Sequence, residues 1–479
     1  MDLIQDRTIV AAASNAPERY IPTVGGLPIR IAATYVFLFV IAFWVYATLW
    51  PSAPIAVSDT GSYLRAAQDL SDFRINELQE RAPGYPLLLL LTASSKSPNR
   101  ALFFLSLALH FASVWLLAGL LYRAGLSELL LHVFALILLL PPYVEYAGYV
   151  LSETLGEAML VAGLAGFVFW ILQKRTTWIV VSAFALGYAA LTRPVYQIVA
   201  LAVVGYLIAV TFLFPWIRLK RAEAVKGSIA LLCGSIIAVG GYSYLNYRNF
   251  GYFGVTPKLG LTLSTKTVRF VERLPDEYAA TRAALVSARN AALLEGDHTG
   301  TMYIWSLVPE LAAITGLEGP ELSGYMLRIN LLLIQKAPLT YLQDMIWAFG
   351  AYWLPSTGEL ANLSSRLLQL LWAVIHFLLI GGFFLSFVLL VGAGIHATLI
   401  GAFVTPERLR GNEVRMVPLQ ALMYGLAGTI VFYTAAISCF IEVGDPRYRV
   451  PTDALIVFML FLGTQSWWRL VSFLKIAAR

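Results

Sequence analysis

A series of long apolar segments is the feature that most constrains how this chain can fold. They lie at about residues 31–50, 99–121, 127–141, 153–172, 177–191, 194–214, 227–246, 365–392, 418–440 and 453–470. A membrane-spanning α-helix needs roughly 20 mostly apolar residues. Because lipid cannot satisfy backbone polar groups, apolar segments of this length are helical. We therefore predict an all-α polytopic membrane protein.

The composition agrees with a membrane protein. Hydrophobic residues make up 59% of the chain and the mean hydropathy is +0.72, whereas soluble domains use roughly 45–50% apolar residues. The net charge of +6 could suggest nucleic acid. However, Lys and Arg gather in short loops between apolar segments, where they set membrane topology. We expect a lipid bilayer as a partner and no nucleic acid.

The basic loops agree on one orientation. They lie at 122–126, 173–176, 215–226 and 405–418, and further basic residues follow the last apolar segment. Cytoplasmic loops carry the excess of Lys and Arg. This places both termini in the cytoplasm. The remaining polar segments then lie on the extracytoplasmic face.

This topology divides the chain into four predicted regions. They are a cytoplasmic tail at 1–30, a membrane module at 31–246 with an outer loop at 51–98, an extracytoplasmic or interfacial subdomain at 247–364, and C-terminal helices at 365–479. Two apolar patches, at 86–92 and 341–355, are short for a full span and suggest interfacial or re-entrant helices. The expected number of spanning helices is therefore about 10 to 13.

Charged residues from separate outer segments are predicted to face one space near the membrane. Asp59, Glu145 and Glu153 supply carboxylates, and Arg193 and Arg447 supply guanidinium groups. An ionised carboxylate can accept a proton from a hydroxyl, and arginine can bind a phosphate with two hydrogen bonds. This combination suits transfer of a group from a lipid phosphate.

Structural roles can also account for these residues when each is taken alone. Asp59 could be a helix N-cap, and Glu153 could stabilise the positive end of a helix dipole. Arg447 and Arg449 could be interfacial anchors. The gathering of charges on one face of a membrane protein nevertheless favours a functional site.

Several short motifs recur in an order that resembles a known superfamily. They are SDTGSY at 58–63, RAPGYP at 81–86, LSE at 151–153, LTRP at 191–194, RNFGYFG at 248–254 and DPRYRVP at 445–451. In order and placement they resemble the GT-C superfamily of polyprenyl-phosphate-sugar glycosyltransferases. The resemblance is to the branch that contains protein O-mannosyltransferases and the bacterial transferase that adds aminoarabinose to lipid A, and it extends over most of the chain.

The resemblance implies a GT-C-like bundle and an inverting transferase on the extracytoplasmic face. Its donor would be a polyprenyl-phosphate sugar, and its acceptor a hydroxyl on a glycan, a lipid or a protein. By this match Asp59 would be the general base, and Glu153 would position the acceptor or the base. Candidate contacts to the donor phosphate are Arg193, Arg447 and Arg449. Candidate pocket residues are Tyr63, Arg81, Tyr85, Glu145, Arg248 and Asn249.

One departure from the family pattern concerns metal ions. Many relatives carry two adjacent acidic residues in the first outer loop, whereas here Asp59 is followed by Thr60. A divalent cation would need several oxygen ligands, and no histidine pair has zinc-ligand spacing. We therefore assign no metal or other cofactor from the sequence, although a divalent metal would be compatible with the family.

A transporter or flippase for a lipid-linked or anionic substrate is the alternative function. Such proteins usually bind their substrate near the bilayer midplane, on broken helices in two related halves. The sequence has no evident repeated halves, and its acidic residues lie at helix ends, which favours the enzyme. The chain lacks an endoplasmic-reticulum retrieval signal, so a bacterial inner membrane is the expected location.

Overall fold

The computed structural model describes residues 23–24, 26–50, 53–213, 219–296, 303–356, 365–401 and 413–477. Most of the predicted tail at 1–30 lies outside these ranges. The described chain is almost entirely helical. One short antiparallel pair, β1 (Thr23–Val24) and β2 (Leu27–Pro28), precedes the first long helix.

Each predicted apolar segment coincides with a helix. The long helices of the membrane bundle are α2 (Ile29–Leu49), α5 (Arg100–Arg123), α6 (Glu128–Leu138), α8 (Glu153–Gln173), α9 (Thr176–Thr192), α10 (Val199–Leu213), α11 (Arg221–Ser235), α19 (Arg366–Gly401), α20 (Glu413–Ile441) and α21 (Val450–Ala477). A π-helical turn, η5 (Ile236–Gly240), continues α11 into α12 (Gly241–Phe250). The prediction of an all-α polytopic membrane protein is confirmed.

The number of spanning helices among the described residues depends on how the bent pair and the shorter apolar helices are counted. Seven helices in the described ranges are long and apolar enough to cross a membrane, and one bent pair would make eight. The predicted segments at α9 and α21 appear as shorter apolar helices, Thr176–Thr192 and Val450–Gln465, by the same measure. Counting these two with the eight gives ten, the lower end of the predicted range.

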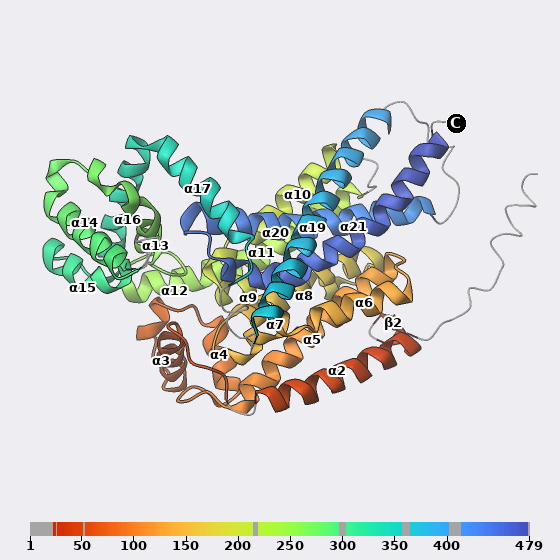
Figure 1. The fold of residues 1–479 in the computed structure, drawn as a ribbon, viewed down its shortest axis with the longest axis horizontal. Coiled ribbons are helices and arrows are strands. Elements are labelled where there is room, and N and C mark those ends of the chain that lie inside the picture. Colours follow the sequence, from red (N-terminus) through yellow and green to blue (C-terminus); the bar gives the residue numbers. More distant parts are fainter. Residues whose placement is uncertain are drawn as a thin grey trace, which may run out of the picture.

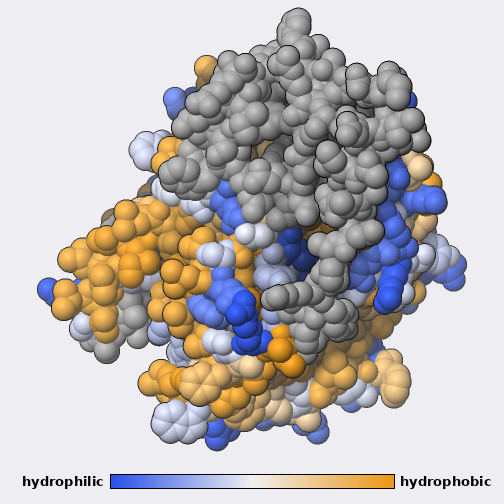
Figure 2. Space-filling view, turned by 90° about the vertical axis from the view of Figure 1, so that its right-hand side faces the viewer, coloured by the Kyte–Doolittle hydropathy of each residue, from blue (hydrophilic) through white to orange (hydrophobic). Residues whose placement is uncertain are grey.

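Helix α8 lies at the centre of the bundle and packs against α5, α9 and α21 (Figure 1). It is the most buried of the candidate spans, because 78% of its most apolar 18-residue stretch is buried inside the protein. By contrast, α2 runs along one edge and exposes Phe37, Val40 and Trp44. Figure 2 shows hydrophobic side chains over much of the described surface that faces the viewer. Such a surface fits contact with lipid.

The helix predicted at 127–141 ends three residues early, and the chain bends after it. Helix α6 ends at Leu138, and α7 (Pro141–Val144) with η2 (Glu145–Gly148) follows at a bend of 64°. Pro142 has no N–H to bond the carbonyl of Leu138, so that carbonyl would lack its helical partner. His110 Nε2 donates to it at 2.8 Å, while Nδ1 lies 3.1 Å from Glu157. The bend is thus stabilised by a buried polar pair.

Residues 258–296 and 303–336 form a separate group of helices at one end of the bundle (Figure 1). The group comprises α13 (Leu259–Thr267), η6 (Val268–Arg273), η7 (Asp276–Tyr278), α14 (Ala279–Leu294), α15 (Ile304–Thr315) and α16 (Gly319–Lys336). We call it the loop subdomain. It has a hydrophobic core of its own, which includes Val271, Leu311 and Met326. Lys266 attaches it to the bundle by donating to the carbonyl of Cys439 at the end of α20.

The two short apolar patches are helices that are too short to span. They are α4 (Gly84–Leu91) and α17 (Pro338–Tyr352). Helix α17 connects the loop subdomain to the bundle and packs against α20. Its opposite face exposes Leu339, Ile346 and Trp347. Tryptophan is enriched where protein meets the lipid headgroups, so α17 fits the interfacial prediction.

Candidate functional site

A backbone bridge joins the first outer loop to the turn before α8. Ile55 pairs with Tyr149, and its N–H donates to the carbonyl of Gly148 at 2.8 Å. Asp59 lies four residues after Ile55, and Glu153 lies four residues after Tyr149. The bridge therefore brings two predicted site carboxylates toward the same end of the bundle.

Asp59 precedes α3 (Thr60–Ser71), but its carboxylate does not cap that helix. The hydroxyl of Thr60 instead accepts the N–H of Val57 at 2.8 Å and holds the turn. Asp59 Oδ1 accepts a hydrogen bond from Arg81 at 2.5 Å, and Oδ2 accepts one from Arg447 at 2.8 Å. The side chain is therefore used for ion pairing, and the N-cap interpretation does not describe it.

Arg447 connects the two carboxylates. Its Nη2 donates to Asp59, and its Nε donates to Glu153 Oε1 at 2.5 Å. The turn η9 (Pro446–Arg449) aims this side chain inward, and Asp445 Oδ1 fixes the turn by accepting the N–H of Arg447 at 2.8 Å. Arg447 thus points into the protein, which is not the geometry of an interfacial anchor.

Arg193 binds Glu153 from the other side. Its Nη1 lies 2.9 Å from Glu153 Oε1 and donates to Ser152 Oγ at 3.3 Å. Ser152 Oγ also lies 3.0 Å from the hydroxyl of Tyr63 in α3. We call Asp59, Arg81, Glu153, Arg193 and Arg447 the ion-pair cluster. It brings together side chains from four separate parts of the sequence.

The ion-pair cluster contains three guanidinium groups and two carboxylates, so it carries one positive charge in excess. Burial alone would raise the pKa of Asp59, but Arg81 and Arg447 outweigh this effect and lower it to about 2. Burial alone would lower the pKa of Arg447, but Glu153 and Asp59 raise it above its ordinary value. The excess positive charge suits an anionic ligand such as a phosphate.

Glu442 is a titratable group beside the cluster that the sequence did not single out. Burial raises its pKa to about 7, although the Tyr448 hydroxyl bonds to the carboxyl and Arg193 lies nearby. The ring of Tyr448 lies 6.0 Å from the Arg193 guanidinium carbon. Glu442 therefore changes its charge near neutral pH, next to the ion-pair cluster.

The predicted pocket tyrosines are placed around Arg81. The guanidinium carbon of Arg81 lies 4.5 Å above the ring of Tyr63, and its Nε donates to Ser62 at 2.8 Å. Tyr85 packs edge-on against Tyr63 with ring centres 4.8 Å apart, and it is buried. Tyr63 thus lies in the site and Tyr85 supports it. Glu145 is buried at the start of η2.

Arg449 has a different role from the one predicted for it. Its side chain is fully buried, and Nε donates to Asp453 at 2.7 Å. Its Nη1 donates to the carbonyls of Tyr352 and Leu354 at 2.8 and 2.7 Å. These contacts join the start of α21 to the end of α17. We therefore remove Arg449 from the residues proposed to bind phosphate.

Helix α12 turns Arg248 and Asn249 toward the surface. Both are exposed, and the Asn249 amide donates to the carbonyl one turn earlier. The buried face carries Tyr242 and Asn246 instead. The Tyr242 hydroxyl donates to the carbonyl of Leu78 at 2.6 Å, next to the first outer loop. Contact with the first outer loop thus comes from Tyr242, and a pocket role for Arg248 and Asn249 stays a prediction.

Lys258 lies beside Arg81 and was not predicted from the sequence. Its ammonium group donates to Glu80 Oε2 at 3.3 Å, and it lies 5.9 Å from the ring centre of Trp305. Burial and the nearby Arg81 lower its pKa. Lys258 belongs to none of the motifs identified in the sequence. It comes near the first outer loop only because the loop subdomain packs there.

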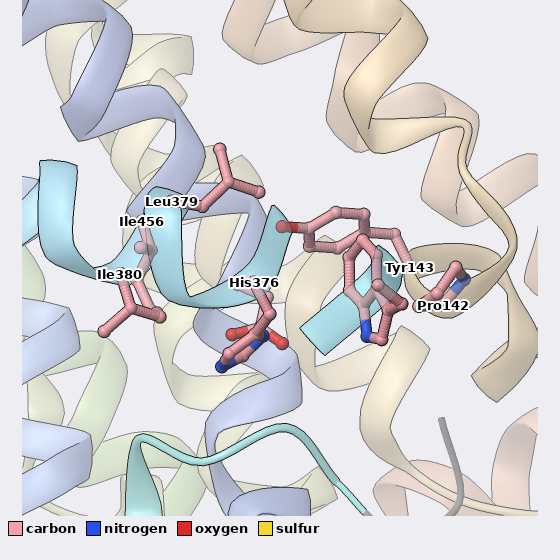
Figure 3. Close-up of a pocket in the computed structure, with 8 residues that line it drawn as sticks. Pro142, Tyr143, His376, Leu379, Ile380 and Ile456 are labelled. Atoms are coloured by element: carbon pink, nitrogen blue, oxygen red, sulfur yellow. The ribbon is translucent and has the colours of Figure 1, made fainter. Parts of the chain in front are cut away.

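A small pocket lies between α7, α19 and α21 (Figure 3). It is lined by Pro142, Tyr143, Trp372, His376, Leu379, Ile380, Asp453 and Ile456. In the close-up, His376 lies between the aliphatic side chains and Tyr143. His376 Nε2 is 3.0 Å from the carbonyl of Trp353, and Asp453 pairs with Arg449. The pocket shares no residue with the ion-pair cluster.

The cluster does not fit a divalent cation. Its carboxylates are already bound by three guanidinium groups, and its excess charge is positive. A hard cation would need several free oxygen ligands. Within the described ranges, no group of three or more His, Cys, Asp or Glu is arranged to hold a metal ion.

The fold and the cluster define a helical membrane protein with a charged site at one end of its bundle. No family model matches the chain, and no curated protein matches it. Among solved structures it is similar to the crystal structure of ArnT from Cupriavidus metallidurans bound to undecaprenyl phosphate, at 17% identity and a TM-score of 0.36. The match covers 93% of this chain and 80% of that chain.

That structure belongs to the branch that the loop motifs resemble.

Proposed function

We propose that this chain is a membrane glycosyltransferase that moves a sugar from a polyprenyl-phosphate donor to an acceptor hydroxyl. The observation that carries the proposal is the position of Asp59, whose two carboxylate oxygens bind two different arginines. A potential base thus lies beside guanidinium groups that can hold a phosphate. The motif order, which resembles the GT-C superfamily, supports the same reaction.

The donor phosphate is assigned to Arg447. Its side chain is 27% exposed, whereas that of Arg193 is only 9% exposed. A phosphate can therefore reach Arg447 more easily than Arg193. Arg193 and the fully buried Glu153 hold Arg447 in place from behind. Glu153 acts as a positioning residue in this account, because Arg447 and Arg193 already contact its carboxylate.

Asp59 is the proposed base. It removes the proton of the acceptor hydroxyl as the acceptor oxygen bonds to the sugar C1. The bond from C1 to the phosphate oxygen breaks at the same time, and its electron pair leaves with the polyprenyl phosphate. Arg447 stabilises this negative charge. Attack opposite the leaving phosphate inverts the configuration at C1.

Phosphate binding would also prepare the base. With both arginines bound, Asp59 has a pKa of about 2 and is a weak base. A phosphate that binds Arg447 withdraws one positive charge from Asp59, which raises the pKa of the carboxyl and increases its basicity. The donor is therefore expected to bind before proton transfer.

The site is assigned to the extracytoplasmic face of a bacterial inner membrane. Helices α5 and α8 run from the end of the bundle that carries the cluster to the end that carries Arg123 and Lys174 (Figure 1). Basic loops favour the cytoplasm, so the cluster lies opposite. A transporter usually has a broken helix in each of two related halves. Within the described helices only one pair is bent as a broken span, so a transporter is less well supported.

The test uses the purified chain in lipid nanodiscs with a labelled polyprenyl-phosphate sugar. We expect Asp59→Asn to keep donor binding and to lower transfer by about 10²- to 10⁴-fold, the usual contribution of a positioned base. Asp72→Asn is the matched control, because Asp72 lies in the same loop and its exposed carboxylate bonds to the neighbouring Arg74 and Ser71, outside the ion-pair cluster. Full transfer by the Asp59 variant would refute the assignment.

A further inference from the structure

The two oxygens of Asp59 face two different surroundings. Oδ2 bonds to Arg447, which leads through Glu153 to the buried Arg193. Oδ1 bonds to Arg81, which lies at the side of the loop subdomain. In an inverting displacement the acceptor oxygen attacks C1 from the side opposite the leaving phosphate, and the base lies beside the acceptor oxygen. The Arg81 side is therefore the side from which an acceptor can approach.

Three side chains extend the Arg81 side. Glu80 precedes Arg81, Lys258 lies at the N-terminal end of α13, and Trp305 lies in α15. The Lys258 ammonium is 3.3 Å from Glu80 and 5.9 Å from the Trp305 ring centre. Trp305 remains 39% exposed. An exposed indole ring next to charged groups can stack on the apolar face of a sugar ring.

The position of Lys258 is fixed by the packing of α13 on α16. Gly260 lies so close to α16 that a Cβ there would be 1.9 Å from the carbonyl oxygen of Ser323. The Asn330 amide donates to the carbonyl of Gly260 at 2.6 Å and to Ser264 at 3.0 Å. The loop subdomain thus presents Lys258 to the first outer loop from a rigid support.

The charges of this patch favour an anion. Lys258 and Arg81 are neighbouring cations, and together with burial this proximity lowers the pKa of Lys258. Arg81 already pairs with Asp59, and Glu80 is 47% exposed, so Glu80 offsets the repulsion only in part. An anionic group between Lys258 and Arg81 would relieve this repulsion.

We propose that Glu80, Arg81, Lys258 and Trp305 form an acceptor subsite for a carbohydrate that carries an anionic group, either a carboxylate or a phosphate. The sugar ring stacks on Trp305, and its anionic group binds Lys258 and Arg81. Glu80 accepts hydrogen bonds from ring hydroxyls. The inference rests on the proposed function, because it takes Asp59 as the base that the acceptor hydroxyl must reach.

The experiment measures glycan binding without requiring transfer. The purified full chain in nanodiscs, saturated with undecaprenyl phosphate, is applied to an array of neutral glycans and of glycans bearing uronic acids or sugar phosphates. We expect acidic glycans to bind at least about 10-fold more tightly than neutral ones, the effect of one charge-assisted contact. Separate uronic acid and phosphate spots identify which anion is preferred.

Variants assign the binding to the patch. Lys258→Gln should abolish the preference for acidic glycans, and Lys258→Arg should retain it. Trp305→Ala should weaken binding of acidic and neutral glycans alike. The matched control is Lys336→Gln, at an exposed lysine at the end of α16 in the same subdomain. Thermal melts verify that each variant is folded.

Three results would overturn the subsite. The first is the absence of any preference for acidic glycans, and the second is a preference that survives in Lys258→Gln. The third is weaker binding of undecaprenyl phosphate itself in Lys258→Gln, which would assign Lys258 to the donor. Failure of the unchanged chain to bind undecaprenyl phosphate would instead count against the proposed function.

Discussion

Replacing Arg447 by alanine is the perturbation for which the structure gives the clearest expectation. Arg447 makes two charge-assisted hydrogen bonds, at 2.8 Å to Asp59 and at 2.5 Å to Glu153. In the proposed complex it turns toward the donor phosphate. Each hydrogen bond to a charged group contributes about 1.5–3 kcal/mol. Losing the bond from Arg447 to the phosphate should therefore weaken binding of the donor phosphate about 10- to 150-fold.

The same substitution should weaken donor binding but make Asp59 a stronger base. Arg447 is one of two arginines that lower the pKa of Asp59, so its removal raises that pKa from about 2. Arg447→Lys keeps the charge, but an ammonium group is a point charge and cannot reproduce the directed geometry of a guanidinium. We therefore expect donor affinity to fall most in the alanine variant and less in the lysine variant.

The assay is binding of undecaprenyl phosphate to the purified chain in nanodiscs, with undecaprenol as the ligand that lacks a phosphate. Arg328→Ala is the matched control, because Arg328 is an exposed arginine in α16, outside the ion-pair cluster. The phosphate ligand should lose affinity in Arg447→Ala while undecaprenol does not. Equal affinities of the unchanged and variant chains for undecaprenyl phosphate would refute the role of Arg447.

Three further substitutions test the surroundings of the cluster. Gly444 has a φ of 77°, and a Cβ there would lie 2.0 Å from the carbonyl oxygen of Ala348; Gly444→Ala should therefore displace the loop before η9 and weaken undecaprenyl phosphate binding, whereas unchanged binding would show that the loop position is unimportant. The folded-state pKa of Glu442 is about 7, above its ordinary value of 4.5, so its contribution to stability is greatest below pH 4.5 and declines as the pH rises toward 7. Glu442→Gln should raise the melting temperature relative to the unchanged chain above pH 7 but not below pH 4.5, and a pH-independent difference would contradict this assignment. His110→Leu leaves the buried Glu157 without its partner and should cost about 3–5 kcal/mol; thermal melts should show partial recovery in the double variant with Glu157→Leu, and no recovery would argue against the pairing.

The positions of the helices could be predicted because a bilayer fixes the length and polarity of a spanning segment. The ends of α5 and α8 agree with the predicted segments within two residues. The segment predicted at 127–141 extends three residues beyond the end of α6 at Leu138. Apolar content alone does not reveal the bend, whose stabilising partner, His110, comes from another helix.

The arginines of the last loop illustrate why the site was harder to predict. Arg447 and Arg449 are two residues apart and chemically identical, yet one joins the ion-pair cluster and the other binds Asp453 and two carbonyls. A 3₁₀ turn has about three residues per turn, so side chains two apart point in different directions. The sequence identifies the motif but not which arginine faces the carboxylates.

Lys258 and Glu442 could not have been chosen from the sequence. Lys258 lies near Arg81 only because the loop subdomain packs beside the first outer loop. Glu442 acquires its raised pKa from burial at the end of α20. Both properties depend on tertiary contacts between distant segments, and no local pattern of residues encodes them.

The central claim is that the ion-pair cluster holds the donor phosphate beside Asp59. Its most direct test is an electron cryo-microscopy structure of the chain in nanodiscs with undecaprenyl phosphate. We expect a phosphate oxygen about 2.7–2.9 Å from a guanidinium nitrogen of Arg447, the distance of a charge-assisted hydrogen bond, with Arg447 no longer bonded to Asp59. A phosphate bound elsewhere, with the Asp59–Arg447 ion pair intact, would contradict the claim.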